Sequence, residues 1–169
     1  MFGNVLKEAR EKAGFTQTDL SNQVPVSRST IAMTETGKRD LPHEVVPTVL
    51  QKLDCGFLVM EAAAHYTGGA FVTKLNGDAV DLHRSAVKEK TIEELHEALE
   101  AIQNDKLANN PQNISPADRE RLEKSLLEVI DAIWSLCHYA AVICKEYGFS
   151  WSELWKKHRI KLKANGYIK

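Results

Sequence analysis

Cysteines, net charge and long apolar runs are all scarce in this chain of 169 residues. The three cysteines, Cys55, Cys137 and Cys144, show no metal-binding spacing and cannot all pair, which predicts reduced thiols in a cytoplasmic protein. No uninterrupted run of about 18 apolar residues occurs, so we expect no membrane partner. Charged residues from Lys7 onward also argue against a signal peptide. The formal net charge of -1 gives no global electrostatic argument for a nucleic-acid partner.

The composition is otherwise ordinary, but charge is unevenly distributed along the chain. With 43% hydrophobic and 27% charged residues, the sequence is able to form a folded core. Residues 88–131 hold 11 acidic and 6 basic residues, whereas residues 148–169 hold 1 acidic and 6 basic residues. This asymmetry predicts an acidic site that faces a basic C-terminal tail.

The first 63 residues show the pattern of five short helices joined by tight turns. The first expected helix covers residues 5–13, the second begins at Thr16, and the third is capped by Ser27. The fourth begins at Pro42, and the fifth covers residues 57–63. Gly14 and Gly37 are expected to end the first and third of them. We therefore expect an all-α domain over residues 1–66.

A connector and a second helical region follow. The dipeptide Asn76-Gly77 lies between apolar segments 70–75 and 79–82, so we expect a short β-hairpin or an extended connector over residues 67–85. Helices are expected over residues 86–104, from Ser115-Pro116 to about residue 147, and from Ser150 to near residue 166, with a loop over residues 105–115. These helices predict a C-terminal helical bundle over residues 86–169.

Residues 15–39 have the sequence FTQTDLSNQVPVSRSTIAMTETGKR, which resembles the Cro/CI-type (XRE) helix-turn-helix family of phage repressors. Leu20, Val24, Val26 and Ile31 occupy the apolar positions that lock two short helices at a steep angle. The resemblance implies a five-helix, lambda-repressor-like DNA-binding domain. Its recognition helix, residues 27–35, is expected to lie in the major groove.

The same resemblance implies roles for ten side chains. Base edges are expected to meet Arg28, Ser29, Ala32 and Met33. Phosphates are expected to meet Gln17, Thr36, Lys38 and Arg39. Arg10 and Glu35 are expected to form a partly buried ion pair that ties the first helix to the recognition helix.

Two residues and the local charge depart from the family pattern. Pro25 stands where a glycine with positive φ is usual, and Thr34 stands where an apolar core residue is usual, which predicts a locally different turn. Residues 1–66 carry 7 basic and 8 acidic residues. This balance predicts modest DNA affinity per monomer, and hence a dimer on paired half-sites.

Two of the expected C-terminal helices each present acids at i, i+3 spacing: Glu94 with Glu97, and Glu128 with Asp131. Four carboxylates brought together need a cation, and with Mg²⁺ or Mn²⁺ they form an oxygen-rich site for the phosphates of a nucleotide. The plain alternative is a solvated helix face. Thr91 with Glu94 also matches a capping box at a helix start.

The segments EELHEALEAI and SLLEVIDAIWSL resemble the motif helices of the MazG-like all-α NTP pyrophosphohydrolases, and the tail resembles that family's K-x-x-x-N segment. The resemblance covers about residues 91–167. It implies metal ligands at Glu94, Glu97, Glu128 and Asp131, a catalytic acid or base at Glu93, and phosphate contacts from Lys161 and Asn165. A bound metal would polarise a phosphate and activate water for cleavage between the α- and β-phosphoryl groups.

Two functional hypotheses follow from these resemblances. The first is a transcriptional regulator, such as a phage or mobile-element repressor, that binds operator DNA and forms a homodimer or tetramer through its MazG-like helices, where it senses nucleotides. The second is a metal-dependent nucleotide pyrophosphohydrolase with an accessory helix-turn-helix. A C-terminal domain that binds nucleotide without hydrolysis, or that only dimerises, also stays open.

Overall fold

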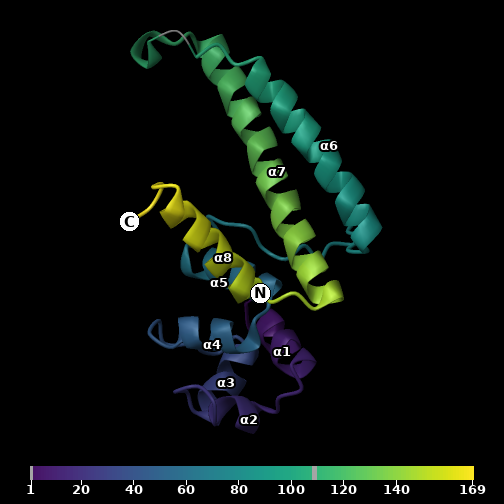
Figure 1. The fold of residues 1–169 in the computed structure, drawn as a ribbon, viewed down its shortest axis with the longest axis vertical. Coiled ribbons are helices and arrows are strands. Elements are labelled where there is room, and N and C mark those ends of the chain that lie inside the picture. The colour runs from purple at the N-terminus through teal and green to yellow at the C-terminus, as the bar shows by residue number, and fades with distance from the viewer. Residues whose placement is uncertain (1, 108–109) are drawn as a thin grey trace. The chain divides into compact units, whose positions relative to one another are not determined.

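The structure is a computed structural model that describes residues 2–107 and 110–169; Met1 and residues 108–109 of the predicted loop lie outside the described residues. The described part is all α-helical, with eight α-helices, one 3-10 helix and no strand, which confirms the all-α prediction. The helices, shown in Figure 1, are α1 (Phe2–Lys12), α2 (Gln17–Ser21), α3 (Arg28–Glu35), α4 (Val46–Leu53), α5 (Gly56–Tyr66), α6 (Arg84–Gln103), η1 (Pro111–Asn113), α7 (Pro116–Tyr147) and α8 (Trp151–Ala164).

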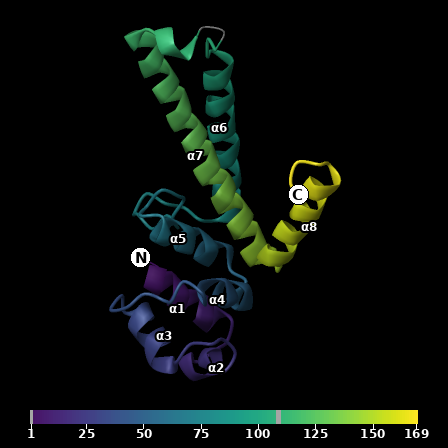
Figure 2. The same cartoon turned by 90° about the vertical axis from the view of Figure 1, so that its left-hand side faces the viewer.

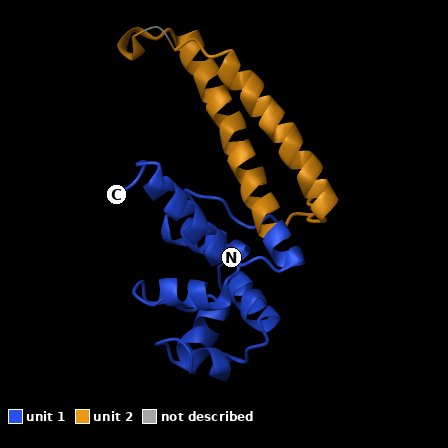
Figure 3. Cartoon of the chain, in the orientation of Figure 1, with its two compact units in different colours: residues 1–75, 143–169 blue, residues 76–142 orange. Residues whose placement is uncertain are grey.

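The chain divides into two compact units, which Figure 3 colours separately. Unit 1 comprises residues 1–75 and 143–169, and unit 2 comprises residues 76–142. Unit 1 therefore holds α1 to α5, the end of α7 and α8, whereas unit 2 holds α6, η1 and most of α7. The domain boundaries expected from the sequence, 1–66, 67–85 and 86–169, stay a prediction because compactness does not test independent folding.

Several helices begin at the capping residues that the sequence predicts. Thr16 forms a capping box with Asp19 at the start of α2, and Ser27 accepts the Thr30 backbone N–H at the start of α3. α7 begins at Pro116, and Ser150 caps α8 by accepting the Glu153 backbone N–H. Each of these hydrogen bonds joins residues three positions apart, which is why local sequence is enough to predict them.

The prediction that Pro42 opens the fourth helix is wrong. Pro42 instead begins a turn, in which its carbonyl accepts the Val45 backbone N–H at 3.0 Å. α4 starts four residues later, at Val46, and the proline in its first turn is Pro47. Both prolines lack an N–H and suit a helix start, so local sequence does not distinguish them.

The β-hairpin predicted around Asn76-Gly77 is also wrong; the structure has the alternative, an extended connector with a turn. A two-residue hairpin loop with the sequence Asn-Gly forms a type I′ turn, which needs positive φ at both central residues. Among the described residues with positive φ, neither Asn76 nor Gly77 occurs. On the near side of the turn, the Lys74 N–H donates to the buried Glu61 carboxylate at 2.9 Å instead of to a paired strand.

The core of unit 1 forms where α1 contacts α3 and α5, and where α2 contacts α3. The four apolar residues predicted to lock the helix-turn-helix are all buried, which confirms that prediction: Leu20, Val24, Val26 and Ile31. Leu6 of α1 and Leu58 of α5 are fully buried in the same unit. These contacts hold α3 in a fixed orientation with one face free.

α8 belongs to unit 1 because its first turn packs on the junction between α4 and α5. Trp151 is buried against Gly56, where an added Cβ would lie 2.6 Å from the Trp151 ring. Asp54 accepts hydrogen bonds from the Ser152 backbone N–H at 2.8 Å and hydroxyl at 2.6 Å. Burial raises the pKa of Asp54, but the hydrogen bonds from Ser150 and Ser152 outweigh it and hold that pKa below its usual value.

Unit 2 is a helical hairpin in which α6 and α7 run antiparallel, side by side in both Figure 1 and Figure 2. Ala98 of α6 and Ser125 and Ala132 of α7 are buried between the two helices. The Thr91 hydroxyl donates to the Val87 carbonyl at 2.7 Å and lies 3.2 Å from the Ser135 carbonyl of α7. The alternative in which Thr91 caps a helix start is therefore wrong, because Thr91 lies inside α6.

By length and composition alone, α7 is apolar enough to cross a membrane. An 18-residue window of this helix has a mean hydropathy of 1.6, and 22% of the window is buried. This window is not an uninterrupted apolar run, because a window of that hydropathy can include charged residues. One such helix in the described part is weak evidence, since core helices of other proteins pass the same test, and the absence of a membrane partner stays a prediction.

Candidate functional site

α3 has an inward and an outward face, as helical periodicity requires. The inward face carries buried residues: Thr30, Ile31, Thr34 and Glu35. The outward face carries the residues predicted to meet base edges: Arg28 and Ser29, which are exposed, and Ala32 and Met33, which are half-buried. The structure thus places all four predicted base-contact residues on one side of one helix.

Glu35 anchors α3 to α1 through a buried ion pair with Arg10. Arg10 Nε and Nη2 donate to the two Glu35 carboxylate oxygens at 2.5 and 3.0 Å, and the side chains are 7% and 3% exposed. The hydrogen bond to Glu35 raises the pKa of Arg10 above its ordinary value, against the opposing effect of burial. Arg10 Nη1 also donates to the Phe15 carbonyl at 2.7 Å, so the same guanidinium fixes the chain before α2.

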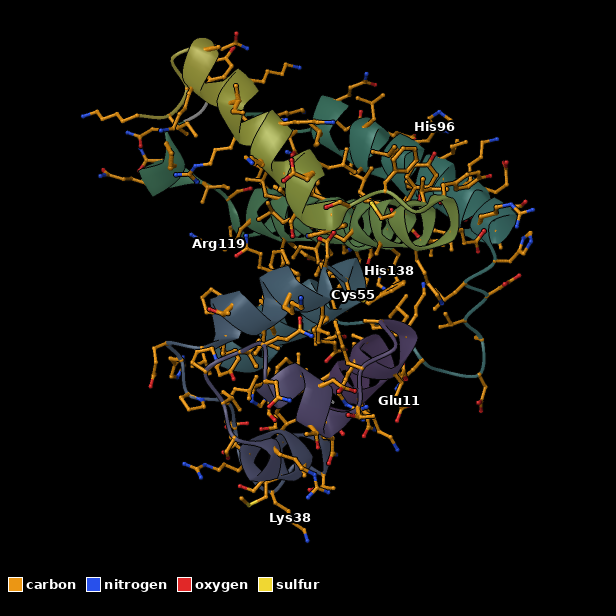
Figure 4. All side chains as sticks on the ribbon, turned by 60° about the horizontal axis from the view of Figure 1, so that its bottom comes forward. Glu11, Lys38, Cys55, His96, Arg119 and His138 are labelled. Atoms are coloured by element: carbon orange, nitrogen blue, oxygen red, sulfur yellow. The ribbon has the colours of Figure 1, made fainter. Side chains whose placement is uncertain are left out.

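The predicted phosphate-contact residues differ in how free their side chains are. Gln17 Nε2 donates to Glu35 at 2.8 Å, so this amide extends the ion pair instead of pointing to solvent. The Thr36 hydroxyl donates to carbonyls at the end of α3, at 3.0 and 3.1 Å. Lys38 and Arg39 are exposed, and Lys38 points away from the body of unit 1 in Figure 4.

A shallow depression connects two of the predicted contact groups. Its walls include the Gly14–Thr18 segment at the start of α2, the end of α1, and Arg28 of α3. Gln17 and Arg28 therefore border one hollow, and Glu11 lines it as well. The hollow thus brings one predicted phosphate-contact residue and one predicted base-contact residue to the same side of the domain.

The two departures from the family pattern are both accommodated locally. The carbonyl of Val24 accepts the Val26 N–H at 2.7 Å, so Pro25 sits at the centre of a tight three-residue turn. The common form of this turn has a negative φ at its centre, which proline supplies. The buried Thr34 hydroxyl donates to the Thr30 carbonyl at 2.9 Å, so no unsatisfied polar group enters the core.

Unit 1 is more basic than residues 1–66 alone, because α8 is part of it. Unit 1 carries 15 Lys and Arg residues against 10 Asp and Glu residues, whereas unit 2 carries 7 against 13. The charge count behind the expected modest affinity covers residues 1–66 alone and leaves out the basic residues of the last 27 positions. A net positive unit attracts a polyanion such as DNA.

In unit 2, three of the four predicted metal ligands come together. Carboxylate oxygens of Glu94, Glu128 and Asp131 all lie within 4.8 Å of one another. Glu97, one turn beyond Glu94 on α6, is exposed and is not part of this group. The predicted four-carboxylate site is thus a three-carboxylate cluster.

Lys90 pairs with one acid of this cluster, and the sequence analysis missed it. Its ammonium lies 2.7 Å from Glu94 and 3.2 Å from Glu93, the predicted catalytic residue. Hydrogen bonds to these carboxylates raise the pKa of Lys90 above its usual value. The i, i+4 spacing of Lys90 and Glu94 on a helix was the available signal.

The predicted phosphate-contact residues of the tail belong to the other unit. Lys161 is exposed on α8, and Asn165 is the residue that ends α8, with its N–H donating to the Lys161 carbonyl at 3.0 Å. Both lie in unit 1, whereas the carboxylate cluster lies in unit 2.

Comparison with known proteins identifies the N-terminal part of the chain. Residues 1–56 match a family model described as a helix-turn-helix domain. No curated protein and no solved structure matches the chain. The chain therefore carries an N-terminal helix-turn-helix domain, which indicates a DNA-binding protein, and the matched residues include the whole of α1 to α4. Because the match ends at residue 56, the resemblance of the C-terminal half to MazG-like enzymes rests on its sequence motifs alone.

Proposed function

We propose that this protein is a sequence-specific transcriptional regulator of the repressor kind, as found in phages and other mobile elements, and that it acts in the cytoplasm. It binds operator DNA with α3 in the major groove. The observation that carries this proposal is the outward face of α3, where Arg28, Ser29, Ala32 and Met33 lie together on a helix of the matched domain.

Contacts to the DNA backbone come from residues on either side of this face. Lys38 and Arg39 follow α3 and are exposed, and the hollow between α2 and Arg28 accepts a phosphate. Two copies on paired half-sites double these contacts, and the helices of the C-terminal half bring the copies together as a homodimer or a higher oligomer.

Replacing Arg28 with alanine is expected to remove sequence preference and leave folding intact. A side chain that contacts a guanine through two hydrogen bonds contributes about 1–3 kcal/mol of discrimination between bases. Selection of binding sites from random duplexes, followed by fluorescence anisotropy on the selected and a scrambled duplex, measures this preference.

Lys38→Gln is expected to weaken binding to both duplexes equally and to lower the slope of log affinity against log salt by about 1.

Arg119→Ala is the matched control, because Arg119 is an exposed arginine on α7 in unit 2. It is expected to leave both the preference and the salt slope unchanged. Sequence preference that survives in Arg28→Ala, with normal circular dichroism, contradicts the placement of the reading face on α3.

A second candidate function is binding or hydrolysis of a nucleotide with a divalent metal ion, and the convergence of Glu94, Glu128 and Asp131 favours it. Carboxylate oxygens are the protein ligands that Mg²⁺ and Mn²⁺ prefer, so the donor set fits such an ion. A metal held there supplies charge that polarises a phosphate and activates water. Lys90 competes with the metal for Glu94, and Glu93 remains the candidate acid or base.

Removing a carboxylate and removing Lys90 are expected to change metal binding in opposite directions. Glu128→Gln is expected to weaken Mn²⁺ binding at least tenfold, measured by electron paramagnetic resonance of the free ion. Lys90→Met is expected to strengthen it, because Glu94 loses its competing cation. Glu100→Gln, an exposed acid of α6 outside the cluster, is the control.

Assays for pyrophosphate release from each NTP and dNTP with Mg²⁺ then separate an enzyme from a binding domain. Equal Mn²⁺ affinity for the wild type and Glu128→Gln removes the basis for this second candidate.

A further inference from the structure

One side of the α6–α7 hairpin exposes large apolar side chains along its length. On α6 these are Ile92, Leu95, Leu99 and Ile102, with exposed fractions from 39% to 53%. Their spacing of three, four and three residues is the spacing of a coiled-coil seam, in which such residues insert between those of a facing helix. The structure thus leaves a complete coiled-coil stripe of α6 in contact with solvent.

α7 carries a matching stripe. Leu126, Ile130, Ile133 and Leu136 repeat at three- and four-residue intervals, with exposed fractions from 42% to 62%. Between Asp131 and Lys145 the sequence contains no Asp, Glu, Lys or Arg. Charge therefore does not interrupt this stripe over its C-terminal half.

Helical geometry places the two stripes on the same side of the hairpin. Each residue advances about 100° around a helix. Ala98 is the buried residue of α6 that faces α7. Around the axis of α6, Glu94 is rotated from Ala98 in one direction and the apolar stripe is rotated in the opposite direction. Around the axis of α7, Asp131 is likewise rotated from Ala132 in one direction and the stripe of that helix in the opposite direction.

Glu94 and Asp131 meet in the carboxylate cluster, so both helices turn their acidic sides the same way. The two apolar stripes must then share the opposite side. The hairpin accordingly has one acidic face and one apolar face, which we call the apolar face of the hairpin.

We propose that the apolar face of the hairpin binds the same face of a second copy of this chain, so that two hairpins form a four-helix bundle. This inference rests on the proposed function, because it names the surface that pairs two DNA-binding units. The carboxylate clusters then point outward, which keeps the acidic faces of two units with 7 basic and 13 acidic residues each away from one another.

The face is large enough to supply most of the area that a dimer needs. A 20-residue helix is about 30 Å long and two adjacent helices are about 20 Å wide, which gives a flat area of roughly 600 Å². A stable interface takes about 800 Å² of accessible surface from each partner. The accessible surface of the face is larger than its flat area, because the side chains protrude from it. An exposed apolar area of this size lies at the upper end of what monomers show, and such patches often mark interaction sites.

A second copy fits this face better than a lipid bilayer does. In a bilayer the acidic face of the hairpin would also leave water, and charged groups within the hydrocarbon are costly. In a four-helix bundle only the apolar stripes become buried, and the two-fold symmetry of the pair corresponds to paired half-sites in DNA.

Light scattering coupled to size-exclusion chromatography, without DNA or detergent, tests the proposal on the full chain. The wild type is expected to have twice the chain mass of 19.0 kDa. The double variant Leu99→Glu/Leu126→Glu is expected to have the mass of one chain with unchanged helical circular dichroism, because both side chains are already exposed in the single chain. Leu107→Glu, an exposed leucine beyond the end of α6, is the matched control and is expected to stay dimeric.

A monomeric wild type overturns the proposal, as does a double variant that folds and stays dimeric. A wild type that is monomeric in buffer and sediments with phosphatidylcholine vesicles assigns the face to lipid instead. A dimer that binds no DNA contradicts only the proposed function, and a monomer that binds DNA with sequence preference contradicts only this inference, so the two are separable.

Discussion

Replacing Arg10 with methionine is expected to lower the free energy of unfolding by about 3–5 kcal/mol, because it leaves the Glu35 carboxylate buried without its cation. Methionine has a similar volume and a flexible side chain, so the loss reflects charge more than packing. Urea unfolding followed by circular dichroism measures the change. Loss of the guanidinium also frees the Phe15 carbonyl, which adds to the effect.

A double-mutant cycle separates the ion pair from other effects. Arg10→Met/Glu35→Leu is expected to recover most of the stability lost in Arg10→Met, since removing both charges avoids burying either one alone. Lys90→Met breaks an ion pair whose Lys90 side chain is 57% exposed and is expected to cost less than about 1 kcal/mol. Additive losses in the double variant would show that Arg10 and Glu35 stabilise the unit independently of each other.

The features that the sequence predicted well are those decided within a few residues. Thr16, Ser27 and Ser150 start helices by accepting N–H groups three residues ahead, and such bonds depend little on the rest of the fold. The buried positions Leu20 and Ile31 follow from helical periodicity together with the family resemblance. The outward face of α3 is the remainder of the same periodic pattern.

Features that depend on distant partners were missed or misplaced. Asn76-Gly77 has strong local preference for a hairpin, but the segment before it bonds to Glu61 of α5, and no strand forms in the described residues. Such tertiary contacts override local strand propensity, whose scale spans only about 1 kcal/mol. Gln17 likewise has a partner that local sequence does not show, because Glu35, 18 residues away, accepts its amide.

Spacing along a helix likewise predicted the acidic cluster only in part. Glu94 and Glu97 share one side of α6, but only Glu94 approaches Glu128 and Asp131. Which member of an i, i+3 pair faces a neighbouring helix depends on the crossing of the two helices, and a single sequence does not define that crossing. The basic tail shows the same limit, because its place with the N-terminal helices depends on Trp151 and Gly56.

Replacing Gly3 with alanine is expected to destabilise the protein by about 3 kcal/mol, the upper end of the range for inserting a carbon into a packed core. Gly3 lies in α1, where helix propensity alone predicts that alanine stabilises by up to about 1 kcal/mol. The structure predicts the opposite sign. An added Cβ would collide with the Thr34 carbonyl oxygen and lie 3.0 Å from the Glu35 carbonyl oxygen, both at the end of α3. Thermal and urea unfolding measure the difference.

The sign of this effect tests how closely α1 packs on α3. The colliding atoms belong to the backbone, which cannot rotate away as a flexible side chain can, so α3 must shift as a unit. Gly77→Ala is the control, since Gly77 has open space around its Cβ position and no positive φ, and its stability is expected to stay equal or rise by up to about 1 kcal/mol. A stabilised Gly3→Ala variant contradicts the close approach of the two helices. The Gly3→Ala variant can also be tested for DNA binding at temperatures where it remains folded. Weaker binding there links the close approach of α1 and α3 to the position of the reading face, because Glu35 and Arg28 lie on the same short helix.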